Sequence, residues 1–353
     1  MTHSTDARNG VLDGLFPKRS ARPRERDGRL ATRYTHCMSA ALPEPSPPAP
    51  DLTHLPAIQR TLLDWYAHEG RDLPWRRVRD PYAILVSELM LQQTQVDRVI
   101  PKWEAWLAQF PTIEALADAP TSDVIKAWSG LGYNRRAINL QRLAQAVVAV
   151  HGGRVPDDVA ELKALPGIGP YTAGAVAAFA HNRPVAMVDV NIRRLLHRLF
   201  VGAEVPDYRI AEAAIWALAR AAVPPGRSAD WHQALMDLGA TICRPRPLCD
   251  RCRVREWCRA APEWAILPPD APRPTKSQGT WEGSNRQYRG RILRALGALP
   301  PGDALSVPLL GARVRDGYSD ADAEWLLTLL RALARDGLVL LSGEGDASIV
   351  RLP

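Results

Sequence analysis

The stretch Leu165-Pro-Gly-Ile-Gly-Pro-Tyr-Thr-Ala173 decides how this chain is expected to fold. Its two glycines, Gly167 and Gly169, form a tight turn directly before a helical pattern. A turn that opens a helix places free backbone N–H groups and the positive end of the helix dipole at one point. Such a point accepts a phosphate oxygen, and glycine lets a nucleic-acid backbone approach closely. The stretch therefore predicts a phosphate contact at the start of a helix.

The flanking residues make this turn more specific. With Leu165-Pro166 before it and Tyr171-Thr-Ala173 after it, the turn resembles the DNA-binding helix-hairpin-helix motif. The alternative is a corner between two helices with a structural role alone. Lys and Arg number 45 against 38 Asp and Glu, a net charge of +7. This surplus favours the first interpretation, because it suits a polyanionic partner such as nucleic acid.

Around this motif, residues 51–242 are expected to form a helical domain. Apolar residues recur at helical spacing, as in Ile58, Leu62 and Tyr66, over stretches of about 10–15 residues. No alternating strand pattern of any length interrupts them. Charged residues are 24% and apolar residues 46% of the 353, which is close to the globular average. The sequence predicts a mainly α fold with a sizeable core.

The two ends of the chain differ from this helical part. Residues 1–50 are basic and rich in proline, so we expect an unstructured tail. A nonspecific DNA-binding arm is the alternative, and Met38 is a candidate start of translation. Residues 263–285 are predicted to be a linker. Residues 286–353 are predicted to form a small α/β unit, similar to a winged helix, in which helices precede a β-hairpin.

Nothing in the sequence indicates a membrane or secreted protein. The longest uncharged stretch, residues 164–182, contains two prolines and three glycines, which a membrane-spanning helix would not contain. The first 35 residues lack the apolar segment of a secretory signal. We therefore expect a cytoplasmic protein without a membrane partner, and a monomer.

Glu88 is the first candidate for catalysis. It lies in Ile84-Leu-Val-Ser-Glu-Leu-Met-Leu-Gln-Gln-Thr-Gln-Val96, where its neighbours are apolar. Apolar surroundings raise the pKa of a carboxyl group, and a general acid at neutral pH needs a raised pKa. The alternative is a Glu on the wet face of an amphipathic helix. Three amides follow that are suited to the edges of bases: Gln92, Gln93 and Gln95.

Asp189 is a second carboxylate among apolar residues, in Val185-Ala-Met-Val-Asp-Val-Asn191. An Asp in such surroundings needs hydrogen-bond partners or a chemical task. It would be satisfied structurally as the N-cap of a helix that starts near Ile192. The residues leave the cap and the catalytic role equally open, and the two are compatible.

Four of the five cysteines form a cluster, which in a cytosolic chain is typical of a metal site. Four thiolates without a histidine suit tetrahedral zinc or an iron–sulfur cube, and the spacing alone does not separate these. Arginines between them would bring positive charge to a phosphate backbone. The cysteines are Cys243, Cys249, Cys252 and Cys258.

Together, the hairpin, Asp189 and the cysteine cluster resemble the helix-hairpin-helix DNA glycosylase superfamily of endonuclease III. Leu73-Pro-Trp-Arg76, Ser87-Glu-Leu-Met-Leu-Gln-Gln-Thr-Gln95 and Gly130-Leu-Gly-Tyr133 are similar to its adenine-DNA glycosylase (MutY) family. The resemblance covers about residues 52–262. It implies a two-lobed helical fold and a [4Fe–4S] cluster in a loop over residues 243–262. It also implies removal of adenine mispaired with 8-oxoguanine or guanine in double-stranded DNA, at the nucleoid of a bacterium.

The resemblance also implies roles for individual residues. Glu88 protonates the departing adenine, Asp189 stabilises the oxocarbenium-like sugar, and Asn191 orients Asp189. Tyr171 stands where strand-cutting relatives carry a nucleophilic Lys, so we expect no Schiff base and a monofunctional enzyme. An extruded adenine needs a pocket and a wedge. The resemblance places Trp75, Arg76 and Gln233 at the pocket, with ordinary core as the alternative for Trp75, and Gln93 and Tyr133 in the duplex.

The sequence departs from the family at some positions. Five residues separate the first two cysteines where six are usual, and Asn134 and Val190 stand where Tyr and Gly are common. Residues 286–353 lack the pattern of the Nudix-like domain that reads 8-oxoguanine, which leaves the opposite-base preference open. One alternative function is a thymine or uracil mismatch glycosylase of the same superfamily, favoured by Tyr171 and by Ala186-Met-Val-Asp189. Another is a non-catalytic DNA-binding iron–sulfur protein.

Overall fold

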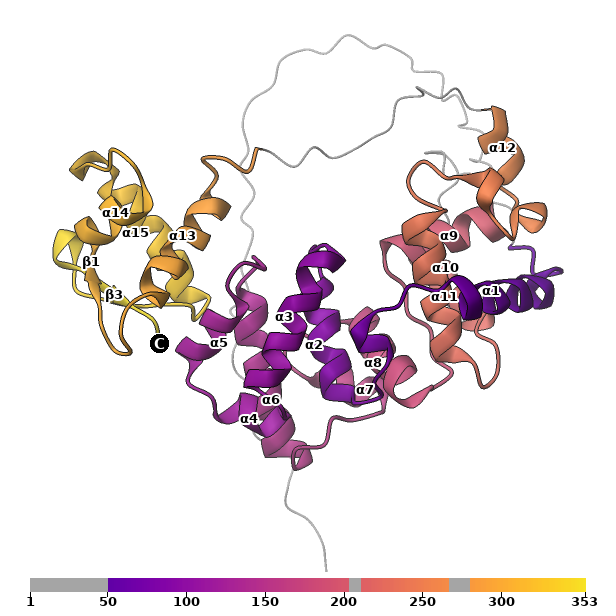
Figure 1. Cartoon of the computed structure of the whole chain (residues 1–353), viewed down its shortest axis with the longest axis horizontal. Helices are drawn as coiled ribbons and strands as arrows, with labels where there is room; N and C mark the ends of the chain where they lie inside the picture. The colour runs from indigo at the N-terminus through magenta and orange to yellow at the C-terminus, as the bar shows by residue number, and fades with distance from the viewer. Residues whose placement is uncertain (1–49, 203–210, 267–279) are drawn as a thin grey trace, which may run out of the picture. The chain divides into compact units, whose positions relative to one another are not determined.

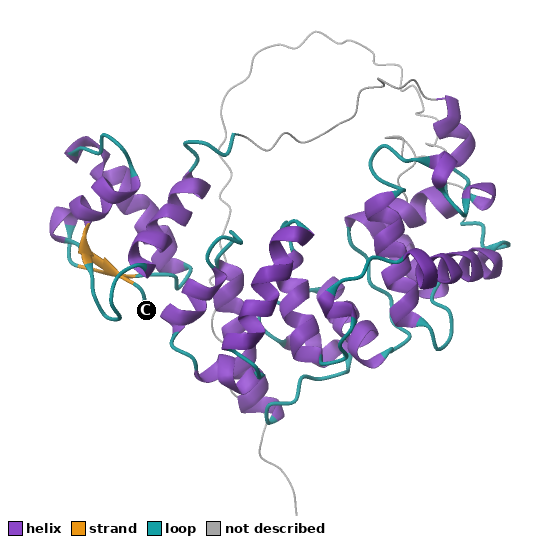
Figure 2. Cartoon of the chain, viewed as in Figure 1, coloured by secondary structure: helices purple, strands orange, loops and turns teal. Residues whose placement is uncertain are grey.

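The computed structural model describes residues 50–202, 211–266 and 280–353. The predicted tail, except Pro50, and residues 267–279 of the predicted linker lie outside this description. Helices make up most of the described residues (Figures 1 and 2), so the predicted mainly α fold is confirmed. None of these helices is both long and apolar enough to span a membrane.

The helices before the cysteine cluster fall into two groups. The first group holds α2 Pro81–Leu91, α3 Val96–Gln109, α4 Ile113–Asp118, α5 Thr121–Trp128, α6 Arg135–His151, α7 Val159–Ala164 and α8 Pro170–His181. The second holds α1 Leu55–Glu69, α9 Val190–Phe200, α10 Glu212–Ala221 and α11 Ser228–Thr241. Contacts between α8 and α11 join the groups, and one apolar core runs through both.

Helix α2 lies at the centre of the first group. Asp80 caps its N-terminus, since its carboxylate accepts from Tyr82 N and Ala83 N at 3.1 Å each, and Pro81 supplies a favourable first residue. Helices α3, α6 and α8 pack around it. Every residue from Tyr82 to Met90 is therefore buried, including one carboxylate.

The cysteine cluster follows α11 and precedes α12 Ala261–Ile266. Two 3₁₀ turns, Cys249–Arg251 and Arg255–Trp257, shape this loop. Backbone bonds attach its far end to α9: Arg259 N donates to Leu199 O at 3.1 Å, and Ala260 N donates to Arg198 O at 3.0 Å. The loop is thus held against a helix of the second group.

The C-terminal unit contains α13 Asn285–Gly297, β1 Leu305–Ser306, α14 Val307–Val314, α15 Ala323–Arg335, β2 Leu340–Ser342 and β3 Ile349–Arg351. Its three strands are antiparallel in the order β1-β3-β2, with Leu341 opposite Val350. The predicted hairpin is confirmed as β2 and β3. Strand β1 was not predicted, because two residues are too short to show an alternating pattern. The core of this unit includes Ile125 of α5 and Ile138 of α6.

Candidate active site

The Gly-x-Gly turn lies between α7 and α8. Leu165 and Ile168 anchor it in the core, while Gly167 and Gly169 are exposed. Gly167 has φ +80°, and a Cβ there would lie 3.1 Å from Asn139 Cβ, so only glycine fits without strain. Gly169 is the N-cap of α8 and has open space around it. The structure therefore leaves the turn that precedes α8 exposed at both glycines.

Glu88 is buried near the end of α2, with 6% of its surface exposed. Burial raises its pKa to about 7. A hydrogen bond from Tyr171 of α8 opposes this shift, the carboxylate of Asp189 adds to it, and the guanidinium of Arg76 opposes it. A substantial fraction of Glu88 is therefore protonated near neutral pH, which a general acid requires.

Asp189 is the N-cap of α9. Its Oδ1 accepts from Ile192 N at 2.7 Å, and its Oδ2 accepts from Asn191 Nδ2 at 3.0 Å. Arg194 Nη2 donates to Asn191 Oδ1 at 3.0 Å and so orients the amide. The capping role left open by the sequence is therefore present, and Asn191 holds the second oxygen of the same carboxylate.

A close approach of two segments brings Asp189 towards Glu88 and Tyr171. A Cβ on Gly174 of α8 would lie 2.5 Å from Ala186 O, so α8 packs directly against the segment that leads to Asp189. Asp189 then contributes to the raised pKa of both Glu88 and Tyr171. One protonated carboxyl group beside a second carboxyl group is the pair that glycosidic bond cleavage uses.

Tyr171 serves this pair as a hydrogen-bond donor. Burial raises the phenol pKa well above 10, and the nearby Glu88 and Asp189 add to the shift. The phenol therefore remains neutral and donates to the Glu88 carboxylate. Tyr171 has neither an amine nor an accessible phenolate with which to attack a sugar.

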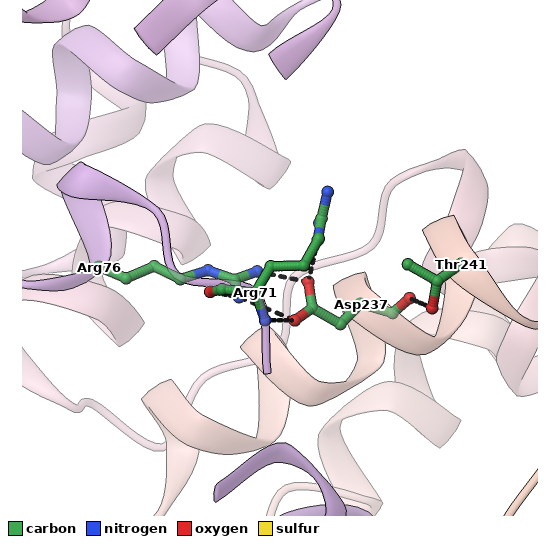
Figure 3. Close-up of polar contacts among 4 residues, drawn as sticks. All are labelled: Arg71, Arg76, Asp237 and Thr241. Carbon is green, nitrogen blue, oxygen red and sulfur yellow. Dashed lines mark hydrogen bonds and ion pairs between the residues drawn. The ribbon is translucent and has the colours of Figure 1, made fainter. Parts of the chain in front are cut away.

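Arg76 is held by a buried carboxylate that the sequence analysis missed (Figure 3). Its Nη1 and Nη2 donate to Asp237 of α11 at 2.9 and 2.7 Å, and Arg71 donates to the same carboxylate through its backbone N at 2.8 Å and its Nε at 2.7 Å. Burial opposes ionisation of Asp237, but the hydrogen bonds and charges of Arg76 and Arg71 outweigh it and lower the pKa. The sequence signal that could have indicated this pair is an Asp on the buried face of α11, because a buried carboxylate needs a partner of opposite charge.

The other expected pocket residues differ in burial. Trp75 is 5% exposed and packs edge-on against Trp103, with ring centroids 6.1 Å apart, so the core alternative fits its position. Gln233 of α11 is partly buried. The structure thus brings Arg76 within electrostatic range of Glu88, while Trp75 lies in the core.

The two residues expected to enter DNA share an unusual backbone. Of the non-glycine residues that the structure describes, three have positive φ: Gln93 at 55°, Tyr133 at 47° and Asn182 at 51°. Asn182 ends α8. Gln93, two residues after the end of α2, and Tyr133, between α5 and α6, are both exposed. Such backbone is costly for a bulky residue, and it gathers at functional sites.

The four cysteines line one cavity together with apolar residues of α9. Among the described residues, no group of three or more candidate ligands is arranged around a single ion. Four thiols around one cavity are the ligand set of an iron–sulfur cluster or of tetrahedral zinc. Arg198 Nη1 lies 3.7 Å from Cys243 Sγ and supplies positive charge. Burial is the main cause that raises the pKa of Cys252 to about 11 and of Cys258 to about 12, so a bound group must displace protons.

Comparisons with known proteins place the fold among DNA repair proteins. The family described as "HhH-GPD superfamily base excision DNA repair protein" matches residues 86–221. A thermostable thymine-DNA glycosylase superposes with a TM-score of 0.56 at 33% identity, over 60% of this chain and all of that one. An endonuclease III–DNA complex, at 19% identity and a TM-score of 0.53 over 62% and 99% of the two chains, shares the fold. Fold and site define a helix-hairpin-helix protein of the base excision repair class.

Sequence relatives narrow this class. The adenine DNA glycosylase of Mycobacterium tuberculosis is 42% identical over 267 residues, 74% of this chain and 84% of that protein. The chain belongs to the adenine DNA glycosylase (MutY) family. The rat relative is 45% identical over 221 residues, 60% of this chain. The match spans less than half of the rat and human proteins, 43% and 40%.

Proposed function

We propose that the chain hydrolyses the N-glycosidic bond of adenine mispaired with 8-oxoguanine or guanine in double-stranded DNA. The observation that carries the proposal is the raised pKa of Glu88, buried beside Asp189 and hydrogen-bonded to Tyr171. Family membership supports adenine as the leaving base, because relatives such as that of M. tuberculosis bear the name adenine DNA glycosylase.

The reaction follows from the two carboxyl groups. Glu88 donates its proton to a ring nitrogen of adenine as the bond to C1′ breaks, so the base leaves neutral. The Asp189 carboxylate stabilises the positive charge that develops on the deoxyribose. Water then adds to C1′, and Glu88 accepts its proton. Asn191 positions Asp189, and Tyr171 positions Glu88. Without an amine at position 171, the enzyme leaves an abasic site and an intact strand.

DNA is held at three places in this proposal. The exposed turn at Gly167 and Gly169 contacts a phosphate through backbone N–H groups. Arg76 and Gln233 lie on the side of the base pocket, and Gln93 and Tyr133 enter the duplex at the mispair as the adenine is extruded. The chain acts as a monomer.

The cysteine cavity is proposed to hold a [4Fe–4S] cluster. The support is the set of four thiols around one cavity and the positive charge of Arg198 beside Cys243. Cys243, Cys249, Cys252 and Cys258 would hold the cluster, which would fix residues 243–258 as a folded loop. The arginines of that loop would then add positive charge for a phosphate backbone. Catalysis itself rests on Glu88 and Asp189.

A second candidate function is excision of thymine or uracil from mispairs with guanine. The solved thymine-DNA glycosylase favours it, since at 33% identity all of that chain is covered. Both functions would use the same fold, so only the identity of the excised base distinguishes them.

A glycosylase assay on four duplexes tests these functions. The substrates carry A opposite 8-oxoguanine, A opposite G, T opposite G, and U opposite G, and strand cleavage is scored with and without hot alkali. Alkali-dependent cleavage at A alone is the expected result. Cleavage at T or U alone would overturn it in favour of the second candidate, and cleavage without alkali would contradict the monofunctional mechanism.

A further inference from the structure

Arg136, in the first turn of α6, has its guanidinium buried between two surface loops. The whole residue is 9% exposed. Its Nη1 donates to carbonyl oxygens at the end of α2, at 2.7 Å from Leu89, 3.1 Å from Met90 and 2.6 Å from Gln92. Carbonyl groups at a helix C-terminus lack partners within the helix, and a cation satisfies them well. Arg136 thus fixes the backbone that leads to Gln93.

The other edge of the same guanidinium contacts the second loop. Its Nη2 donates to Gly132 O at 3.0 Å and to Leu131 O at 3.4 Å, and its Nε donates to Tyr133 O at 3.4 Å. Nη2 also reaches Thr94 Oγ1 of the first loop at 3.2 Å. One rigid, planar group therefore joins two loops that are about forty positions apart in the sequence.

The bonds fall on the residues that precede the two left-handed ones. Gln92 O is directly before Gln93, and Gly132 O is directly before Tyr133. Arg136 also lies over the Tyr133 ring, 5.6 Å from its centroid. A strained backbone persists only where its surroundings hold it in place. The guanidinium is the shared element that holds both.

The charge of Arg136 is held by neutral groups of the two loops. Among the residues that the structure describes, no carboxylate forms an ion pair with Arg136, so carbonyls and one hydroxyl are its hydrogen-bond acceptors. A buried charge without a counter-charge lowers stability unless several hydrogen bonds compensate. The hydrogen bonds to both loops provide this compensation, so the charge is stable only while the two loops keep their positions around it.

We propose that Arg136 is a positioning residue that holds Gln93 and Tyr133 as one rigid wedge, so that both enter the duplex together during base extrusion. The inference rests on the proposed function for the identity of the extruded base. It adds a residue that touches neither the base nor the sugar.

The test compares Arg136→Lys with Arg135→Lys. Both variants keep the positive charge, and Arg135 is the preceding residue on α6 with an exposed side chain (68%). The substrate is a duplex with A opposite 8-oxoguanine and 2-aminopurine beside the adenine, whose fluorescence rises as the stack opens. Single-turnover adenine release is measured as well. A second duplex has an abasic site opposite the adenine, where no base pair must be broken.

Arg136→Lys is expected to slow both the fluorescence rise and adenine release from the paired duplex by about 10- to 100-fold. This fold-change corresponds to a typical coupling energy between neighbouring groups. Release from the duplex with the abasic site stays near the wild-type rate, and Arg135→Lys behaves as wild type. Equal slowing on both duplexes, or equal effects of the two variants, overturns the proposal.

A double-mutant cycle with Tyr133→Ala identifies the route of the effect. If Arg136 acts through the wedge, Arg136→Lys adds little slowing in the Tyr133→Ala background, whereas a full additional loss overturns the proposal. Should Arg136→Lys unfold below the assay temperature, Thr94→Val replaces it, because it removes one acceptor and leaves the charge buried as before. Its smaller slowing must also disappear in the Tyr133→Ala background.

The failure of this proposal is distinguishable from failure of the proposed function. A wild-type chain that raises the fluorescence without releasing adenine overturns the proposed function. The effect of Arg136→Lys on the fluorescence rise can still be measured in that case. A wild-type chain that releases adenine without any fluorescence rise overturns the wedge.

Discussion

At the scale of single residues, burial raises the pKa of the Glu88 carboxyl group. The same side chain on a wet helix face would be ionised at neutral pH, and α2 is buried along its length because three helices surround it. The pKa of about 7 is therefore a property of packing. Tyr171 and Arg76 moderate the shift, so that the group can both give and accept a proton.

This pKa predicts how activity depends on pH. In the proposed mechanism the protonated form of Glu88 is the acid, and its population falls as pH rises through about 7. We expect single-turnover adenine release to fall about tenfold per pH unit above that value, and Glu88→Gln to lose about 10²- to 10⁴-fold at pH 7. Rates are measured from pH 5.5 to 9. The exposed Glu104→Gln on α3 is the control, and a flat wild-type profile contradicts the assignment.

The buried pair of Arg76 and Asp237 predicts a large effect on stability. Asp237→Asn leaves the Arg76 guanidinium, 8% exposed, without its counter-charge. We expect a loss of about 3–5 kcal/mol in the free energy of unfolding, measured by urea denaturation. Asp72→Asn breaks the exposed ion pair with Arg77 and should change nothing measurable. Equal effects of the two substitutions would show that burial does not strengthen the first pair.

At the scale of elements, the two hairpin glycines have separable tasks. Gly167→Ala places a side chain at positive φ beside Asn139, so the unfolding free energy falls by about 1 kcal/mol or more. Gly169→Ala meets open space, so the melting temperature stays unchanged. Its methyl group instead keeps a phosphate away, and DNA affinity falls.

Melting curves and DNA titrations of these two variants measure the difference. A melting temperature lowered as much by Gly169→Ala as by Gly167→Ala would mean that both glycines are structural. An unchanged DNA affinity for Gly169→Ala would remove the phosphate contact from this turn.

The cysteine loop is the second element with a prediction of its own. A [4Fe–4S] cluster gives four iron atoms and four sulfides per chain, whereas zinc gives one metal ion. We expect metal analysis of the purified chain to give about four iron atoms per chain. Cys252→Ser should lower it and make residues 243–266 accessible to protease, while helices α2 to α8 remain protected. One zinc and no iron would contradict the cluster.

At the scale of the whole molecule, the C-terminal unit shares its core with the helical domain. Ile138 of α6 is 3% exposed and belongs to the same buried apolar cluster as Leu326 and Leu330 of this unit. Ile138→Ala should cost about 2–5 kcal/mol and release the C-terminal unit earlier in limited proteolysis. Ile58→Ala, in the core of the helical domain, should destabilise the chain without this early release.

The amino-acid sequence by itself determined those features that depend on residues close to one another in the chain. The glycine turn, the apolar environment of Glu88, the Asp189 cap and the spacing of four cysteines are local patterns, and helix periodicity together with turn chemistry predicts them. The helical fold and the C-terminal hairpin followed from the same signals.

The tertiary structure alone decided which distant groups meet. Asp237 lies 161 positions from Arg76, so no local pattern shows that they pair or that Trp75 enters the core. Arg136 appeared in the sequence as one more basic residue beside a glycine turn, yet its guanidinium joins loops from two helices. The docking of Ile125 and Ile138 against the C-terminal unit was equally invisible. Long-range contacts depend on how whole helices pack, and the sequence encodes that packing only collectively.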